Sequence, residues 1–117
     1  MVGRWLQRVP PGMSEWLLQR ATAVLMALYA VGITLRLVLV PPQGYAGWQA
    51  LFANQAMKLA TFVFVLGMLL HAWIGLRDVL ADYVPHIGLR SLLRKLVTLA
   101  LLALAAWTWL ILWSVAA

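Results

Sequence analysis

Cysteine is absent from this chain of 117 residues, and charged residues are scarce, at 10% of the total. The lack of cysteine excludes a disulfide framework, a thiolate-bound iron–sulfur or zinc site and a covalently attached c-type haem within the chain. It does not exclude a haem held by histidine. Hydrophobic residues make up 65% of the chain, far above the share of a soluble domain, so the chain needs lipid or a large partner to cover its surface.

Acidic residues are the scarcest charged type, with three against nine basic residues and a net charge of +6. This charge does not indicate a nucleic-acid partner, because the basic residues bracket hydrophobic segments and form no single patch. We expect them to contact lipid headgroups and to set the orientation in the membrane.

Three segments approach or exceed the roughly 20 apolar residues that a membrane-spanning helix needs. They cover about residues 16–40, 58–79 and 96–117. The sequence therefore predicts an all-α membrane protein with three transmembrane helices in a single membrane-anchor domain, residues 1–117. A cleaved signal peptide is the rival interpretation of residues 1–40, but no small-residue cleavage site leads into a soluble domain.

The connections between the predicted spans are short. Residues 41–57 open with two prolines, which cannot continue a helix, and the following AGWQALFANQ is expected to form a short interfacial helix. A second break is expected at Pro85 and Gly88. Seven basic residues flank one side of the spans and two the other, which places the N-terminus in the cytoplasm and the C-terminus in the periplasm.

His71 is the ionisable residue inside an apolar run, LATFVFVLGMLLHAWIGL, residues 59–76. Such residues are candidates for function when a partner can be named. At about 100° per residue it shares one helix face with Gly67 and Gly75. The glycines could allow close helix packing, with His71 bonded to a neighbouring helix, or clear space for a flat macrocycle bound at His71. Spacing leaves both explanations open.

Several polar residues lie near the cytoplasmic ends of the first two spans. Arg20 is explained by ordinary anchoring at the headgroups or by a haem propionate. Asp82 and Tyr83 could bind a quinone, the phenol donating to a carbonyl and the carboxylate orienting the ring or relaying protons. Without other information the simpler explanation is favoured, in which Tyr83 is an interfacial residue and Asp82, with Asp78, pairs with Arg77, Arg90 or Arg94. Tyr29, deeper in the first span, is expected to bond a partner helix.

Two motifs carry a family resemblance: LLQRATAVLMALY in the first span and HAWIGLRDVLADYV across the second. They resemble the smaller of the two hydrophobic membrane anchors of bacterial succinate dehydrogenase. The second motif is specific, because it combines a histidine, a glycine four residues on and a D-Y pair eleven and twelve residues on. The resemblance covers nearly the whole chain, except that GRWLQRVPPGMSEW does not match the family pattern.

The resemblance implies a haem b shared with a second anchor subunit, each anchor supplying one histidine. His71 matches the ligand from the smaller anchor, and Arg20 matches an arginine near the propionates. Tyr83 matches the tyrosine that hydrogen-bonds ubiquinone, and Asp82 neighbours that site.

The leading hypothesis is a membrane anchor of succinate:ubiquinone oxidoreductase, respiratory complex II of the tricarboxylic acid cycle, not an enzyme by itself. Its expected partners are the flavoprotein subunit, the iron–sulfur subunit and the second membrane anchor subunit, in the bacterial inner membrane. The alternatives are an anchor of a quinol:fumarate reductase and a cofactor-free scaffold subunit. A transporter is disfavoured, because no span carries a carboxylate away from its cytoplasmic edge.

Overall fold

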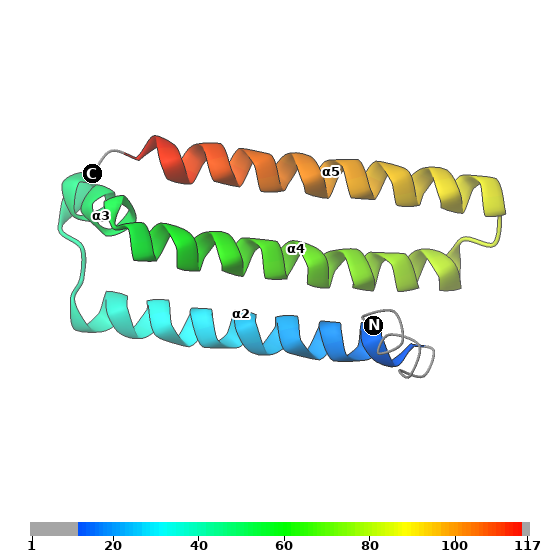
Figure 1. The fold of residues 1–117 in the computed structure, drawn as a ribbon, viewed down its shortest axis with the longest axis horizontal. Helices are drawn as coiled ribbons and strands as arrows, with labels where there is room; N and C mark the ends of the chain where they lie inside the picture. Colours follow the sequence, from blue (N-terminus) through cyan, green and yellow to red (C-terminus); the bar gives the residue numbers. More distant parts are fainter. Residues whose placement is uncertain (1–11, 116–117) are drawn as a thin grey trace, which may run out of the picture.

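The computed structural model describes residues 12–115, which form four helices and no strand (Figure 1). The helices are α2 (Met13–Leu39), α3 (Gly44–Ala53), α4 (Gln55–Tyr83) and α5 (Ile87–Ser114). The three long ones have the length and apolar composition needed to cross a membrane. The predicted all-α architecture with three spans is therefore confirmed, and the short helix expected between the first two spans is α3.

Helix ends coincide with residues that cannot continue a helix or that cap one. Val40, which precedes two prolines, leaves the helical conformation at φ −135° and ends α2. The Asn54 side chain accepts hydrogen bonds from the backbone N–H groups of Ala56 and Met57, at 2.9 and 3.2 Å, and so begins α4. His86 does the same for α5, its Nδ1 accepting from the Leu89 N–H at 3.0 Å.

The connection between α4 and α5 is tighter than the sequence suggested. Between α4 and α5, only the residues from 84 to 86 are non-helical. Gly88, which was expected to be part of the break, lies in the first turn of α5. The reason is that Pro85 alone ends α4, while His86 immediately caps the next helix. The basic residues that follow therefore belong to α5 itself (Arg90, Arg94 and Lys95).

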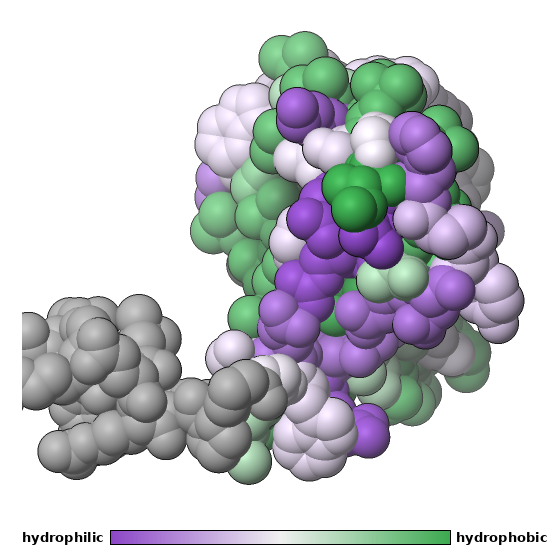
Figure 2. Space-filling model, turned by 90° about the vertical axis from the view of Figure 1, so that its right-hand side faces the viewer, coloured by the Kyte–Doolittle hydropathy of each residue, from purple (hydrophilic) through white to green (hydrophobic). Residues whose placement is uncertain are grey.

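Helix α4 lies between α2 and α5 and contacts both (Figure 1). The described chain measures 51 × 31 × 28 Å, and the start of α2 and the end of α5 lie at opposite ends of the bundle. The start of α2, the end of α4 and the start of α5 share one end, here called the polar end. Figure 2 views this end and shows hydrophilic residues gathered over it.

Few hydrophobic side chains are buried within the chain: Leu51, Ile74 and Leu112. Most others are exposed along all three long helices, as expected for helices that face lipid or partner helices. The polar groups between helices are paired. Tyr29 and Thr61 hydroxyls lie 2.7 Å apart, which confirms the expected bond from Tyr29 to another helix.

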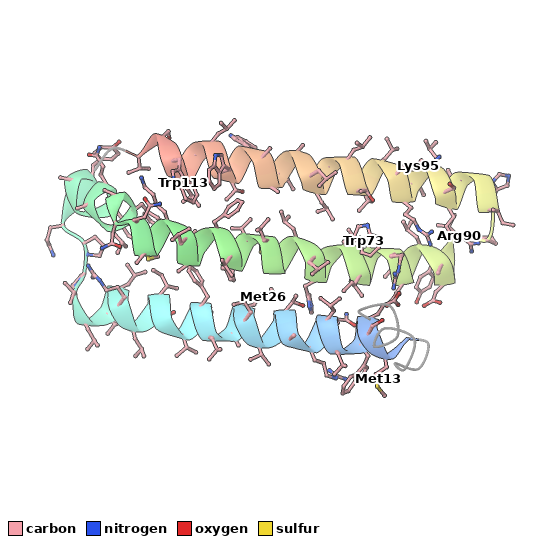
Figure 3. The ribbon with its side chains drawn as sticks, in the orientation of Figure 1. Met13, Met26, Trp73, Arg90, Lys95 and Trp113 are labelled. Carbon is pink, nitrogen blue, oxygen red and sulfur yellow. The ribbon has the colours of Figure 1, made fainter. Side chains whose placement is uncertain are left out.

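The α4–α5 contact has its own polar pair. Trp73, which points from α4 toward α5 in Figure 3, donates from its indole nitrogen to the Thr98 hydroxyl at 3.1 Å. At the opposite end of the bundle the buried Lys58 donates from Nζ to the Val115 carbonyl at 2.8 Å. Pairs of this kind remove the cost of placing polar groups in hydrocarbon.

Gly67 lies where α4 packs closely against α2. It is buried, and a Cβ added there would lie 2.7 Å from Cδ2 of Leu25. A methyl group at this position would require the end of the Leu25 side chain to move, and a larger side chain would overpack the α2–α4 contact.

We therefore expect Gly67→Leu to lower the free energy of unfolding by about 1 to 3 kcal/mol, the usual cost of overpacking. Thermal unfolding of the protein purified from membranes in detergent would measure this. Gly32→Leu is the matched control, because a Cβ on Gly32 meets nothing within 4 Å. Equal melting temperatures for the two variants would contradict the packing role of Gly67.

Candidate functional site

The His71 side chain is half-buried between α4 and α2. Its Nδ1 lies 3.2 Å from the Gln19 carbonyl oxygen and 3.1 Å from the Thr22 hydroxyl oxygen. A carbonyl only accepts hydrogen bonds, so Nδ1 carries the ring proton and donates it. Nε2 then has the lone pair, and no hydrogen bond to it is present within residues 12–115.

The two glycines that flank His71 have different surroundings. Gly67, one turn before it, packs against Leu25 of α2, as close helix packing requires. Gly75, one turn after it, has nothing within 4 Å of the position its Cβ would occupy. Close helix packing is therefore confirmed for Gly67, while Gly75 borders open space and the structure does not decide what occupies it.

Arg20 is exposed, and its guanidinium lies over the ring of Trp16, 4.5 Å from the ring centroid. It follows Gln19, whose carbonyl meets the imidazole of His71. The backbone of Arg20 is thus at the depth of His71 in the bundle. Its side chain is not engaged in an ion pair with any residue of the described range.

An ion pair joins α2 and α4 at the polar end. The Arg77 guanidinium pairs with the Glu15 carboxylate across the two helices and also lies 3.6 Å from Asp78. The same guanidinium lies over the Trp73 ring, 5.0 Å from its centroid. The charge of Arg77 is therefore paired with acidic side chains of this chain, whereas Arg20 has no acidic partner among the described residues.

Asp82 and Tyr83 occupy the last turn of α4 and are exposed, Tyr83 at 79%. Neither side chain makes a hydrogen bond or ion pair with another of residues 12–115. The rise of a helix separates Tyr83 from His71 by roughly 18 Å along α4. The ion pair proposed as the alternative explanation of Asp82 is thus absent from the described part of the chain, where Arg77 pairs with Glu15 and Asp78 instead.

The sequence did not identify the contact of Thr22 with His71, and it placed Glu15 on the cytoplasmic side without predicting its ion pair with Arg77. Both lie on the face of α2 that meets α4, three and four residues from Gln19. Thr22 is 6% exposed within an apolar helix, and the signal that could have found it is its place close to a boundary arginine. Which face of α2 meets α4 is decided by packing, and the sequence pattern did not indicate it.

The side chains of residues 12–115 offer no metal site that is complete in itself. No group of three or more histidine, aspartate or glutamate side chains within residues 12–115 is arranged to bind a metal ion. A single imidazole with a free nitrogen is suited instead to a metal that already has other ligands, as in a haem.

Comparison with known proteins places this arrangement in a family. Residues 4–112 match the family of succinate dehydrogenase/fumarate reductase transmembrane subunits. The chain is also 37% identical over 113 residues to the succinate dehydrogenase hydrophobic membrane anchor subunit of Coxiella burnetii (strain RSA 493 / Nine Mile phase I), covering 97% of this chain and 96% of that protein. The chain belongs to the succinate dehydrogenase/fumarate reductase transmembrane subunit family. It is a multi-pass membrane anchor that works in a complex with other subunits.

The Glu15–Arg77 pair is expected to stabilise the α2–α4 contact modestly, because the carboxylate is 47% exposed. Glu15→Gln and Arg77→Gln should each lower the free energy of unfolding by up to about 1 kcal/mol, as for other part-exposed pairs. A double-mutant cycle in detergent-extracted complex would measure the coupling. If the two effects simply add, the pair contributes nothing to stability.

Proposed function

We propose that this chain is the smaller membrane anchor of a bacterial succinate:ubiquinone oxidoreductase and supplies one axial ligand, His71, to a haem b. The observation that carries the proposal is the imidazole itself. Its Nδ1 proton is held by α2, which leaves Nε2 free to bind iron. The second axial ligand would come from the other anchor subunit, since the only other histidine, His86, caps α5 at the polar end.

The residues around His71 fit a flat macrocycle. Gly75 leaves space for a ring edge on the side of α4 next to His71. Arg20 is at the depth of His71, exposed and free of acidic partners within the described chain. A propionate would offer it a stronger partner than the Trp16 ring, because a carboxylate and a guanidinium form charge-assisted hydrogen bonds.

When bound, the haem supplies a one-electron carrier within the membrane. The chain's own part is to hold the imidazole in one orientation, to balance a propionate with Arg20 and to exclude water with the apolar residues of α2 and α4. Thus the chain supplies position and charge, and the haem supplies the redox chemistry.

We propose that Tyr83 and Asp82 form part of a ubiquinone site at the polar end. The Tyr83 hydroxyl would donate to a quinone carbonyl, and the Asp82 carboxylate would orient the ring or relay a proton. In support, both side chains are exposed and have no hydrogen-bond or ion-pair partner within residues 12–115. They also lie in the last turn of α4, at the polar end of the bundle, over which Figure 2 shows hydrophilic residues gathered.

The partners follow from this assignment. The polar end would face the cytoplasm, in line with the excess of basic residues on that side, and the iron–sulfur subunit would bind there to pass on electrons taken from succinate by the flavoprotein. The matching family includes both succinate dehydrogenase and fumarate reductase subunits. The 37% identical anchor from Coxiella burnetii is named for succinate dehydrogenase, which favours that direction of electron flow over quinol:fumarate reductase.

His71→Ala should abolish or strongly weaken the low-spin haem b spectrum of the assembled complex, because the axial nitrogen is lost. A reduced-minus-oxidised difference spectrum per mole of complex would measure it. His86→Asn, which changes the other histidine and keeps a capping side chain, is the control and should retain the spectrum. A normal haem b spectrum in His71→Ala would refute the ligand assignment.

Tyr83→Phe should lower the rate of ubiquinone reduction about tenfold, since one hydrogen bond to a quinone carbonyl is worth about 1 kcal/mol or slightly more. Succinate oxidation with an artificial acceptor that bypasses the quinone should be unchanged. Tyr45→Phe is the matched control, because Tyr45 is equally exposed, at 82%, on α3 at the other end of the bundle. Equal loss of both activities in Tyr83→Phe would argue against a quinone role.

A further inference from the structure

Thr22 is the one residue of α2 that is buried, with its polar side chain 6% exposed. Its hydroxyl oxygen lies 2.8 Å from the Leu18 carbonyl and 3.0 Å from the Gln19 carbonyl. It also lies 3.1 Å from Nδ1 of His71, on the neighbouring helix. The Thr22 hydroxyl oxygen is therefore within hydrogen-bond distance of three polar atoms, two carbonyl oxygens of its own helix and one imidazole nitrogen of α4.

The hydrogens in this cluster can be assigned from the chemistry of its members. The Gln19 carbonyl can only accept, so its contact with Nδ1 of His71 is a hydrogen bond only when Nδ1 carries the ring proton. The Thr22 hydroxyl then cannot donate to Nδ1, and its single proton points to the Leu18 or the Gln19 carbonyl. Toward His71 the hydroxyl oxygen then offers a lone pair. The Gln19 carbonyl, 3.2 Å from the same nitrogen, also offers only lone pairs. Both oxygens thus require the proton on Nδ1 and the lone pair on Nε2.

We infer that Thr22 is a positioning residue for the axial ligand, fixing both the tautomer of His71 and the rotation of its ring. The inference rests on the proposed function, in which Nε2 of His71 binds iron. A hydrogen bond accepted from Nδ1–H makes the imidazole a stronger donor to the metal and holds its ring plane. If the Thr22 hydroxyl is removed, the Gln19 carbonyl, at the longer distance of 3.2 Å, is the one remaining acceptor for the Nδ1 proton among the described residues.

The backbone contact of Thr22 does not by itself define this role. Thr34, on the same helix, bonds the carbonyl four residues earlier in the same way, at 2.6 Å, and is exposed, with no contact to a histidine. Thr22 differs in being buried and in facing α4 at the level of His71. Thr34→Val is therefore a matched control for removing a threonine hydroxyl from α2.

Three substitutions separate the hydroxyl from the volume of the side chain. Thr22→Val keeps the volume and removes the hydroxyl, Thr22→Ala removes both, and Thr22→Ser keeps the hydroxyl in a smaller side chain. A positioning role predicts that Val and Ala are impaired and Ser is close to wild type. A role in packing alone predicts that Val is close to wild type while Ala and Ser are impaired together.

The variants would be made in the complete complex and extracted in detergent. The haem content per complex and the rate of haem transfer to an excess of apomyoglobin would be measured, together with the midpoint potential of the haem. For Thr22→Val and Thr22→Ala we expect haem loss to be faster by tenfold or more, the usual effect of removing a partner of a metal ligand being about 10- to 100-fold. We expect the potential to rise, because a weaker imidazole donor stabilises the oxidised iron less.

Unchanged haem loss and potential in Thr22→Val would overturn the inference. If Thr22→Val does not assemble, equal behaviour of Thr22→Ala and Thr22→Ser would overturn it instead. His71→Ala measured in parallel separates this failure from that of the proposed function. Retention of haem in His71→Ala removes the ligand assignment itself, whereas loss of haem there with a normal Thr22→Val removes only the role of Thr22.

Discussion

The hydrogen bond from Nδ1 of His71 to α2 is the contact on which the candidate site depends. An imidazole in an apolar span must satisfy its N–H group inside the protein, because lipid offers no acceptor. Gln19 and Thr22 supply two acceptor oxygens. One contact thereby joins the first two spans, fixes the tautomer of His71 and leaves its second nitrogen free. The proposed haem ligation is a consequence of how α2 and α4 meet.

The need to pair buried polar groups also explains contacts elsewhere along the bundle. Tyr29 with Thr61 and Trp73 with Thr98 pair polar atoms across neighbouring helices within the apolar region. Such bonds contribute on average about 0.6 kcal/mol each between membrane helices, so their effect is to fix which faces meet more than to hold the helices together. Arg77, paired with Glu15, closes the α2–α4 contact at the polar end.

Much of the architecture could be predicted from local sequence. Apolar length predicted three spans, because a bilayer requires it, and the proline pair after Val40 predicted where the first helix ends. Tyr29 was expected to bond another helix, and it does. The last connection was predicted to be longer than it is, because the capping of α5 by His86 depends on its side-chain rotamer and backbone geometry. Residue type alone does not indicate that geometry.

The sequence by itself determined that the chain is helical, that it has three membrane-spanning helices and that His71 is an ionisable residue within the apolar run 59–76 of the second, because composition and hydrophobic length are local properties. Only the tertiary structure decided which glycine packs and which leaves space, that Thr22 meets His71, and that Arg77 and not Arg20 is committed to an ion pair. These depend on the rotation of α2 about its axis relative to α4. The close approach of Leu25 to Gly67 is one contact that depends on that rotation. Hydrophobicity alone leaves the rotation undetermined, since nearly every face of these helices is apolar.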